Sequence, residues 1–456
     1  MNARLFPASL LLAALAIAGP AVRAQDVMPP PTDAGAQPPA SDGKGPALTL
    51  IELTDLALRL NPKTRQAWAA IRQSEAGVTL AKAGYWPVID GNITASRIRP
   101  LNFSGQNAAT QTRYGASVSL SYLLWDFGLR SGTLDQARFT LASSQLSQNQ
   151  TFQDVVLQVE QSYYQTLGFE AVVDANRQSL KDAETNLAAA RDRRTSGLAT
   201  VGDVYQAEAA LAGARLALQQ AEGQLATARG TLAAAVGYKP DTSLALAPWD
   251  VPAKPEIPQT DVADLLQEAR DARPELLASK ALEQAAMSAL KATRGKGLPS
   301  LSFDANAGDT HVQGIGSSTQ FSGVLTLKVP LFAGFADRAA VNQAQAQLDT
   351  ARADTEVLRS QVELEVWQAW QNLRTAAVTL DSSAAQLKSA QLAADVTSER
   401  YKNGLDTILD VLSAQTTLAN ARVQQVQAQL DWAAARATLG HAVGGLKAPS
   451  STAESP

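Results

Sequence analysis

Two stretches of eight residues in this chain follow the same pattern, and this repetition constrains the fold more than any other feature. Residues 197–204 read Gly-Leu-Ala-Thr-Val-Gly-Asp-Val and residues 404–411 read Gly-Leu-Asp-Thr-Ile-Leu-Asp-Val, at an offset of 404 − 197 = 207. Without a gap, the same offset matches other residues, among them Leu124 with Leu331, Trp125 with Phe332, Arg215 with Arg422 and Gly237 with Gly444. Repetition at a fixed offset indicates that one half of the chain builds what the other half builds.

The repetition divides the chain into predicted parts. We predict a first structural repeat over residues 48–237 and a second over residues 261–444. A linker with five prolines, residues 238–260, joins them. Residues 25–47 are rich in Pro, Gly and Ala without periodicity and are predicted to be a disordered leader, and we expect the tail 445–456 to be loose.

The N-terminal residues predict export. Residues 1–24 combine a positive charge at Arg4, an apolar run and a small-residue site before Gln25, which is the pattern of a secretory signal peptide. The chain contains no cysteine, so we expect the exported protein to have neither a disulfide nor an N-terminal lipid anchor.

Composition argues against several classes of function. A formal net charge of −4 and a sequence pI near 5.5 disfavour a nucleic-acid partner, which needs a basic face. The two histidines, His311 and His441, are far apart in sequence, and we expect both in solvated loops rather than in a metal site or a catalytic triad. Acidic pairs such as Asp182 and Glu184 fit solvated helix faces. We therefore predict no enzyme activity, no catalytic residues, no metal and no cofactor.

Each repeat contains a predicted pair of β-strands. In the first repeat, apolar residues alternate with glycine and serine over residues 114–124, and a weaker alternation over 89–95 precedes them. The second repeat has the same period over 301–307 and 321–329, with Val324 as the exception. A period of two gives a strand one apolar and one polar face. Strands of about ten residues have the length that a tilted strand needs to cross a membrane.

Long helices follow the strands. Residues 128–196 and 336–403 contain no proline, and the 69 residues of the first would make a helix of about 100 Å. Apolar residues at spacings of three, four and seven, with small residues between them, are typical of close antiparallel coiled coils. Residues 202–237 and 261–295 together have the length to run beside 128–196. We therefore expect one long helix to face two shorter ones stacked end to end.

Four strands are too few to seal themselves in a membrane. A four-stranded sheet leaves two open edges, and unpaired backbone groups are costly in lipid. Closing a barrel takes at least about eight strands. We therefore expect several copies of the chain to pool their strands in one barrel, with the polar strand faces around a water-filled lumen and the helices forming a second barrel.

Aromatic residues cluster where the predicted strands meet the helices. Trp86, Trp125, Phe127 and Phe332 are the candidates for a girdle at the membrane interface. The alternative is that these side chains pack together and fill the junction as a small core.

These features together resemble the TolC family of outer-membrane efflux and secretion ducts. The resemblance runs from about Leu48 to Gly444 and includes the duplication, the strand pairs, the junctions at 124–128 and 330–332, and the Gly-Leu…Asp-Val tips. It implies a mainly α fold with a membrane β-barrel contribution, in which a homotrimer forms a twelve-strand barrel in the outer membrane on a twelve-helix barrel in the periplasm. It also implies partners, namely a periplasmic adaptor (membrane fusion protein), an inner-membrane pump or ABC exporter, and outer-membrane lipid.

The resemblance also implies roles at the helix tips. Gly197, Leu198, Gly404 and Leu405 would contact the adaptor. Asp410 would line an acidic ring at the constriction, and Tyr401 and Asp203 match positions of the links that hold the tip closed. This chain has Asp406 where family members can carry a basic partner for those links, and Ser413 where a second acidic residue can sit.

Local helix chemistry explains the same tip residues without a gate. The two tip glycines are good helix ends, because glycine adopts positive φ without strain. Asp203 and Asp410 would be N-caps of the helices that follow, with Gln206 completing a capping box after Asp203. The residues by themselves leave the gate and the caps as alternatives.

The predicted function is an outer-membrane channel, the exit duct of a tripartite efflux pump or type I secretion system. The alternative is a periplasmic coiled-coil adaptor, which shares long Ala-rich hairpins, but the lipoyl-like β domain and membrane anchor of adaptors have no counterpart in the sequence. Cargo stays open, because the pump and the adaptor select it.

Overall fold

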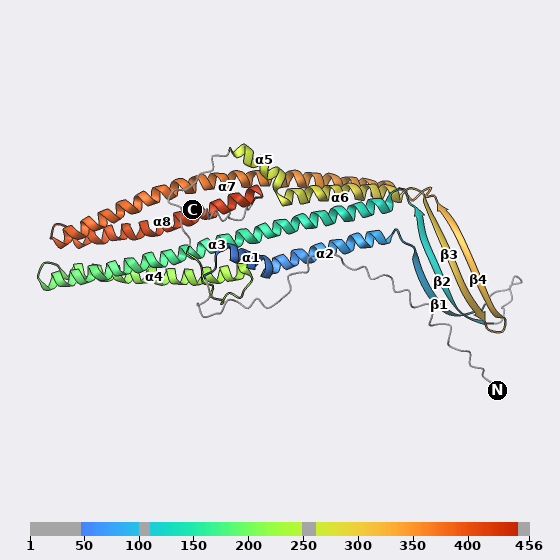
Figure 1. Ribbon diagram of the computed structural model, residues 1–456, viewed down its shortest axis with the longest axis horizontal. Helices are drawn as coiled ribbons and strands as arrows, with labels where there is room; N and C mark the ends of the chain where they lie inside the picture. Colours follow the sequence, from blue (N-terminus) through green and yellow to red (C-terminus); the bar gives the residue numbers. More distant parts are fainter. Residues whose placement is uncertain (1–46, 100–109, 249–260, 446–456) are drawn as a thin grey trace, which may run out of the picture. The chain divides into compact units, whose positions relative to one another are not determined.

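The computed structural model describes residues 47–99, 110–248 and 261–445. In both halves of the chain a pair of strands is connected to a long helix and a shorter one (Figure 1). The elements in chain order are α1 (Leu50–Leu60), α2 (Pro62–Ala83), β1 (Val88–Ile98), β2 (Gln111–Trp125), α3 (Leu129–Thr195), α4 (Val201–Val236), α5 (Val262–Ala272), α6 (Pro274–Lys296), β3 (Ser300–Val312), β4 (Gly316–Lys328), α7 (Ala336–Lys402) and α8 (Ile408–Val443). The predicted signal peptide, the leader up to residue 46, residues 249–260 of the linker and the tail from residue 446 lie outside the described residues.

The long helices have the predicted extent. α3 and α7 each contain 67 residues, about 100 Å of helix, and their first residues are 336 − 129 = 207 positions apart. The shorter helices that follow them, α4 and α8, contain 36 residues each. Within the described part of the chain, no helix has both the length and the apolar character that crossing a membrane requires.

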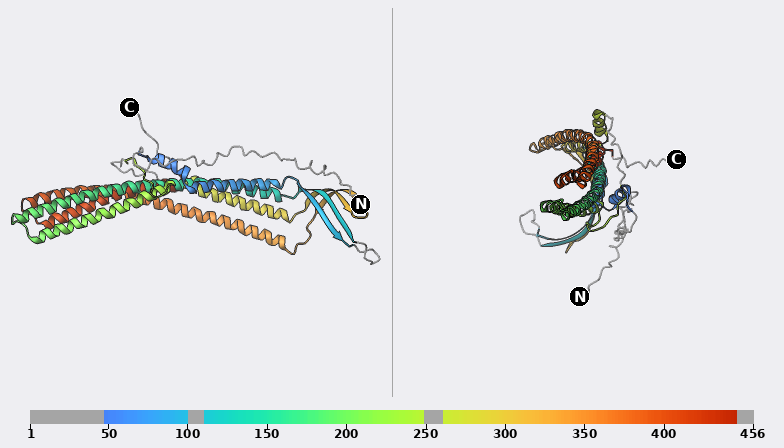
Figure 2. Two further views of the ribbon diagram at one scale, coloured as in Figure 1. Left: turned by 90° about the horizontal axis from the view of Figure 1, so that it is seen from below. Right: turned by 90° about the vertical axis from the view of Figure 1, so that its left-hand side faces the viewer.

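Apart from the short helices α1 and α5, the helices lie side by side in one curved layer (Figures 1 and 2). Beside the sheet, the order across the layer is α2, α3, α6, α7, and towards the far ends of α3 and α7 it is α4, α3, α8, α7. α3 therefore faces α4 along one part of its length and α6 along the other, as predicted. α2 and α4 lie along one edge of the layer, and α7 lies along the opposite edge.

Two helix breaks were not predicted. α1 ends before Asn61-Pro62 and α5 ends before Arg273-Pro274, and each proline is the first residue of the next helix. Proline costs no hydrogen bond at this position, but it holds the residue before it in an extended conformation, which ends the preceding helix. The stretch 261–295, predicted as one helix, is consequently divided into α5 and α6.

The strands form one antiparallel sheet in the order β1-β2-β3-β4, and each contains 11 to 15 residues, more than predicted. Their register gathers the apolar residues on one face, where one row is Gly91, Val118, Ala307 and Phe321. The neighbouring row, on the other face, is Asp90, Ser119, Asn306 and Ser322. The sheet thus has an apolar face and a polar face, as the alternation predicts.

The largest group of buried side chains surrounds the middle of α3 and draws on both repeats. Leu53 of α1, Val155 and Val159 of α3, Val366 of α7 and Trp432 of α8 belong to it. Because apolar residues from helices far apart in the sequence share this core, it holds the two repeats together.

Candidate functional site

Two tight turns form the tips of the helical hairpins. The backbone turns at Gly197 after α3 and at Gly404 after α7, and each glycine has a φ of +76°. The amides of Leu198 and Leu405 donate back to carbonyls of the last helical turn at 2.8 and 2.9 Å, which completes the predicted glycine-based helix ends. Both leucine side chains are exposed. The four residues predicted to contact an adaptor thus lie together at the tips.

Asp203 and Asp410 are not the N-caps that the sequence predicts. The N-caps of α4 and α8 are Thr200 and Thr407, three residues earlier. Each aspartate carboxylate accepts a hydrogen bond from the threonine amide, at 2.7 Å for Asp203 and 3.0 Å for Asp410, while each threonine hydroxyl accepts one from the aspartate amide. This reciprocal capping box satisfies two amides that the helix start leaves free. The box after Asp203 is therefore built with Thr200, and not with Gln206.

The charge of Asp410 is stabilised within its own turn. The Thr407 hydroxyl donates to the Asp410 carboxylate at 2.6 Å, and this hydrogen bond, followed by that of the Thr407 amide, holds the pKa of Asp410 below its usual value. Arg400 binds both oxygens of Asp406 through Nε, at 2.9 and 3.0 Å, and this contact raises the pKa of Arg400. Asp406, which departs from the family pattern, has its basic partner in the same tip.

Tyr401 lies between the two tips. Its side chain is buried, and the Arg193 guanidinium from the other hairpin lies over its ring, with 4.6 Å between Cζ and the ring centroid. The same guanidinium donates a hydrogen bond to the Tyr401 carbonyl. Burial raises the pKa of the Tyr401 hydroxyl, Arg193 opposes this change, and the charge of Asp203 adds to it. Among the described residues the Tyr401 hydroxyl has no hydrogen-bond partner, and Asp203 instead serves its capping box.

Arg193 was not among the predicted site residues, although the repeat holds a signal for it. Arg193 and Arg400 are equivalent, since 400 − 193 = 207. The second repeat provides Asp406 for its arginine, whereas the first has Ala199 at the matching position, 406 − 207 = 199. Because its own turn offers no carboxylate, Arg193 reaches across to Tyr401 on the neighbouring hairpin.

The first hairpin carries a regular series of ion pairs between α3 and α4, which sequence reasoning also missed. Successive pairs are seven residues apart on both helices, with separations from 2.7 to 3.9 Å: Glu170–Arg229, Arg177–Glu222, Glu184–Arg215 and Arg191–Glu208. Exposed pairs of this kind contribute about 0–1 kcal/mol each, so this ladder matters more for the register of the two helices than for stability. The matching positions on α7 are Ala377, Ala384, Gln391 and Ser398, so the second hairpin cannot form it.

Two arginines of α8, Arg422 and Arg436, are equivalent to Arg215 and Arg229 of the ladder. They interact with acidic residues of α3 instead. Arg422 binds Asp182 at 2.9 Å, and the two side chains are only 16% and 21% exposed. Arg436 attracts Glu160, a carboxyl whose pKa is raised chiefly by burial. Asp182, predicted to be solvated, thus links the two hairpins. The prediction failed because its partner is 240 residues away in the sequence.

A buried ion pair organises the junction between the sheet and the helices. Asp126 and Arg130 pair at 2.9 Å with side chains only 10% and 14% exposed. The Arg130 guanidinium also donates to the carbonyls of Gly84, Leu123 and Leu124 at 3.2, 2.6 and 3.1 Å. It therefore ties together the chain leaving α2, the end of β2 and the start of α3. The matching residues in the second repeat are Ala333 and Asp337, so only the first repeat has this pair.

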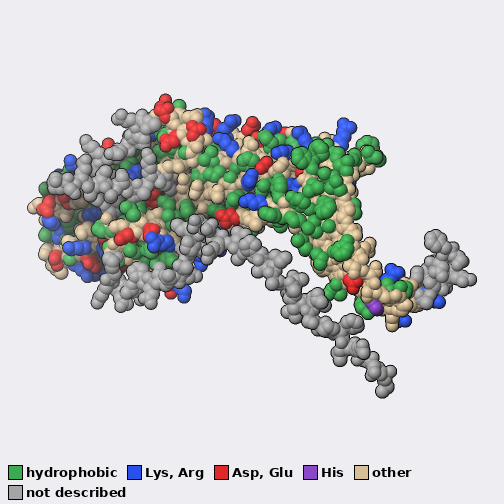
Figure 3. All heavy atoms as spheres, turned by 45° about the vertical axis from the view of Figure 1, so that its right-hand side comes forward, with side chains coloured by type: hydrophobic (Ala, Val, Ile, Leu, Met, Phe, Trp, Pro, Cys, Tyr) green, Lys and Arg blue, Asp and Glu red, His purple; other side chains and the backbone are tan. Residues whose placement is uncertain are grey.

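The predicted girdle residues lie on the surface of the same junction. Trp86, Trp125, Phe127 and Phe332 are each more than half exposed. Figure 3 shows hydrophobic side chains gathered over the sheet where it adjoins the helices. Such exposure disfavours the alternative of a packed core, because core aromatics are covered. It fits side chains that lie at a membrane interface and are covered there by lipid, and the girdle remains a prediction.

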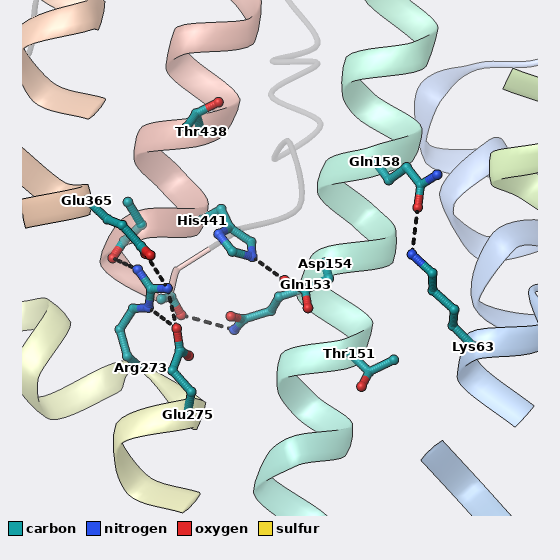
Figure 4. Close-up of polar contacts among 12 residues, drawn as sticks. Lys63, Thr151, Gln153, Asp154, Gln158, Arg273, Glu275, Glu365, Thr438 and His441 are labelled. Atoms are coloured by element: carbon teal, nitrogen blue, oxygen red, sulfur yellow. Dashed lines mark hydrogen bonds and ion pairs between the residues drawn. The ribbon is translucent and has the colours of Figure 1, made fainter. Parts of the chain in front are cut away.

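A second polar cluster joins α8 to α3 and α6 (Figure 4). Arg273 is 4% exposed and lies between Glu275 and Glu365, with Nε donating to Glu275 at 2.6 Å and Nη2 lying 2.9 Å from Glu365. Its Nη1 donates to the Ala442 carbonyl at the end of α8 at 3.0 Å.

The prediction that both histidines are solvated loop residues is wrong. His441 lies in the last turn of α8 and its Nε2 is 2.8 Å from an Asp154 carboxylate oxygen on α3 (Figure 4). His311 lies in β3, and its ring is 4.7 Å from that of Tyr114. Both partners are remote in sequence, so no local pattern could have identified them.

Comparison with known proteins decides the family. The family model for "Outer membrane efflux protein" matches residues 53–238 and 265–445, most of both repeats. The chain belongs to this family. It is 31% identical over 425 residues to Protein CyaE of Bordetella pertussis, covering 91% of this chain and 89% of that one. It is 28% identical over 398 residues to the outer membrane efflux protein BepC of Brucella suis, covering 86% and 84%.

A solved structure of similar fold agrees with this family. The outer-membrane channel OprN superposes with a TM-score of 0.79 at 22% identity, covering 87% of this chain and 90% of that chain. The predicted resemblance to TolC-like ducts and the predicted fold class, mainly helical with a small antiparallel sheet, are thereby confirmed.

Proposed function

We propose that this chain forms a homotrimeric outer-membrane channel, the exit duct of a tripartite efflux pump or type I secretion system. The four-stranded sheet carries the proposal. Among the described residues, β1 and β4 each pair with one strand only, so both outer edges are open. Lipid does not tolerate open edges, and three copies with four strands each supply the twelve strands of a closed barrel.

The length of the strands supports a membrane location. From Tyr114 near the far end of β2 to Trp125 at its base are 125 − 114 = 11 residue steps. At about 3.4 Å per step and a tilt of about 40°, this distance corresponds to about 29 Å along the barrel axis. An outer-membrane barrel has an apolar band of about 25 Å between its aromatic girdles. The apolar face of the sheet would contact lipid, and the polar face, with Asp90 and Asn306, would line the lumen.

The tips are the proposed end of the duct that meets its partners. Gly197, Leu198, Gly404 and Leu405 would contact a periplasmic adaptor, which connects the duct to an inner-membrane pump or ABC exporter. The exposure of the two leucines supports this assignment, because it leaves both side chains accessible to a partner. Asp410, Asp203 and Tyr401 would form the periplasmic constriction, with the Arg193–Tyr401 contact holding neighbouring hairpins together.

The assembly state and the pore test this function directly. Purified from outer membranes in detergent, the protein should have the mass of three copies and should conduct ions in planar lipid bilayers. A monomer recovered from the soluble periplasmic fraction would contradict both the barrel and the duct.

Asp410 should set the cation preference of the pore. Three ionised carboxylates at the constriction attract cations, so Asp410→Asn should reduce the cation-to-anion permeability ratio, whereas Asp410→Glu should keep it, because glutamate also serves a capping box at this position. The measurement is the reversal potential in a salt gradient across a planar bilayer. An unchanged ratio in Asp410→Asn would remove this residue from the pore.

The pH dependence follows from the lowered pKa of Asp410. A carboxyl with a depressed pKa is ionised at every pH above the pKa of a free aspartate, about 3.9. It loses its charge only as the pH falls through its lower pKa in the folded protein. The permeability ratio should therefore be constant from pH 7 to about pH 5 and fall only below about pH 4. A decline centred near pH 6 would indicate that another group sets it.

A further inference from the structure

A pocket of about 640 Å³ opens at the junction between the sheet and the helices of the first repeat, here called the junction pocket. It lies between the end of α2, the chain that joins α2 to β1, the base of β2 and the start of α3. Tyr85, Trp86 and Tyr122 form its aromatic walls, and Lys82 and Arg138 supply positive charge. None of the described residues that line it is acidic. Such a lining suits an anionic group that is attached to an apolar body.

The two cations of the junction pocket are available to a ligand. Within the described part of the chain, no carboxylate forms an ion pair with Lys82. Arg138 contacts Asp135 at 3.5 Å, but Asp135 also pairs with Lys291 at 3.6 Å, and the Arg138 side chain is exposed. An exposed contact of this length leaves most N–H groups of the guanidinium available. Both side chains can therefore donate hydrogen bonds to a phosphate that enters from outside.

One aromatic wall of the junction pocket is held in place by the protein. The Arg130 guanidinium lies over the Tyr85 ring, with 4.9 Å between Cζ and the ring centroid, and Arg130 is itself fixed by its buried pair with Asp126. Trp86, in contrast, is 74% exposed and offers its ring at the edge of the pocket. A wall that is already fixed lowers the entropy cost of binding a ligand against it.

The junction pocket adjoins the apolar face of the sheet. Tyr122 lies four residues from Val118 on β2 and therefore on the same face. Further along that face is a shallow trough of about 390 Å³. Small residues line the trough between two larger ones, in the set Leu120, Ala305, Ala307, Gly323 and Phe321. A polar headgroup in the pocket and a hydrocarbon chain in the trough would thus lie on one continuous surface.

The second repeat builds its junction without this lining. α7 matches α3 at the offset of 207, while α6 matches α2 at an offset of 274 − 62 = 212. The positions that correspond to the pocket residues hold Gly297 for Tyr85, Leu298 for Trp86, Val329 for Tyr122 and Gln345 for Arg138. Because a sheet and its helices are joined there without the aromatic rings and the second cation, these side chains are not required to form such a junction.

We propose that the junction pocket binds the phosphate of an anionic phospholipid from the periplasmic leaflet of the outer membrane. The inference rests on the proposed function, which places the apolar face of the sheet in lipid and the helices in the periplasm, and it names a lipid and its site. Lys82 and Arg138 bind the phosphodiester, Tyr85 and Trp86 cover the glycerol backbone, and an acyl chain follows the apolar face. Aromatic and basic residues are the side chains that proteins place at the depth of lipid headgroups.

The charge of the headgroup decides which lipid the junction pocket prefers. Phosphatidylglycerol has a net negative charge, which two cations attract. The ammonium group of phosphatidylcholine would lie close to the same two cations and would be repelled by them. Native mass spectrometry of the detergent-purified protein with added phosphatidylglycerol should therefore show three copies of the chain with up to three retained lipids. Phosphatidylcholine at the same concentration should be retained far less.

Variants of the cations test the junction pocket itself. Lys82→Gln/Arg138→Gln should weaken the retention of phosphatidylglycerol by at least about tenfold, because the charged donors to the phosphate are lost. The matched control is Arg294→Gln/Lys296→Gln, which removes the same charge from exposed residues at the end of α6 in the second repeat and should leave retention unchanged. Trp86→Leu introduces the residue of the second repeat and should also weaken retention, although it changes no charge.

Failure of this inference is distinguishable from failure of the proposed function, because the same spectra give the mass of the assembly. A trimeric, conducting protein whose Lys82→Gln/Arg138→Gln variant retains as much phosphatidylglycerol as the unmodified protein would overturn the lipid site alone. Equal losses in this variant and in the control, or six lipids retained with equal affinity, would also overturn it, since the lining of the first repeat would then confer nothing specific. A monomeric unmodified protein would overturn both.

Discussion

Replacing Arg130 by alanine should lower the free energy of unfolding by about 3–5 kcal/mol. The variant leaves the Asp126 carboxylate, only 10% exposed, without its cation and deprives the carbonyls of Gly84, Leu123 and Leu124 of their donor. A buried charge without a partner is costly because the surrounding protein cannot replace its water shell. Urea unfolding of the detergent-purified protein, followed by tryptophan fluorescence, measures the loss.

Arg138→Ala is the matched control for that experiment. Arg138 lies on the same helix and pairs with Asp135 at 3.5 Å, but its side chain is 57% exposed. Its replacement should cost no more than about 1 kcal/mol, because water screens the pair and solvates either group alone. Equal losses for the two variants would show that burial does not govern the Arg130 pair.

Arg273→Ala should cost a similar amount, about 3–5 kcal/mol. The variant leaves Glu275, whose side chain is 12% exposed, without its cation and leaves the Ala442 carbonyl at the end of α8 without its donor. The control is Arg270→Ala, whose pair with Glu363 is 43% and 32% exposed and whose loss should be at most about 1 kcal/mol. The same urea titration serves both.

The duplication suggests a further variant for the stability experiment on Arg273. In the first repeat, the same joint is built by Asn61, whose amide donates to the Ala235 carbonyl at 2.8 Å, and Ala235 matches Ala442 at 442 − 235 = 207. The residues Asn61-Pro62-Lys63 begin α2 as Arg273-Pro274-Glu275 begin α6, at an offset of 273 − 61 = 212 rather than 207. The double variant Arg273→Asn/Glu275→Lys should therefore recover most of the stability that Arg273→Ala loses. If it were no more stable than Arg273→Ala, the two joints would not be interchangeable.

Regular elements were predictable from the sequence because their signals are local and repeated. The long proline-free stretches predicted α3 and α7 to within a residue or two, and the period of two predicted which residues share each face of the sheet. The helix breaks before Pro62 and Pro274 were missed, although proline after a residue with an extended conformation is itself a local signal.

The candidate site was predictable only in part. The tip turns follow from their glycines, whereas the assignment of Asp410 as an N-cap was wrong because Thr407, three residues earlier, begins the helix and leaves the aspartate to complete the box. The contact of Arg193 with Tyr401 and the pair of Arg422 with Asp182 join residues more than 200 positions apart. Such partners depend on which helices lie side by side, and no pattern within one helix specifies that.

The ion-pair ladder between α3 and α4 limits how the length of the first hairpin can change. Deleting one residue from α3 would rotate every later rung by about 100° away from its partner on α4. A deletion of seven residues in α3 alone would restore the rotation but would shift α3 by one rung. Because the signs alternate along the ladder, each acid would then lie opposite an acid and each arginine opposite an arginine. Only paired changes in both helices preserve the matching. Changes in the reach of the hairpin into the periplasm that keep the ladder therefore come in discrete increments, each of about 10 Å or a multiple of it.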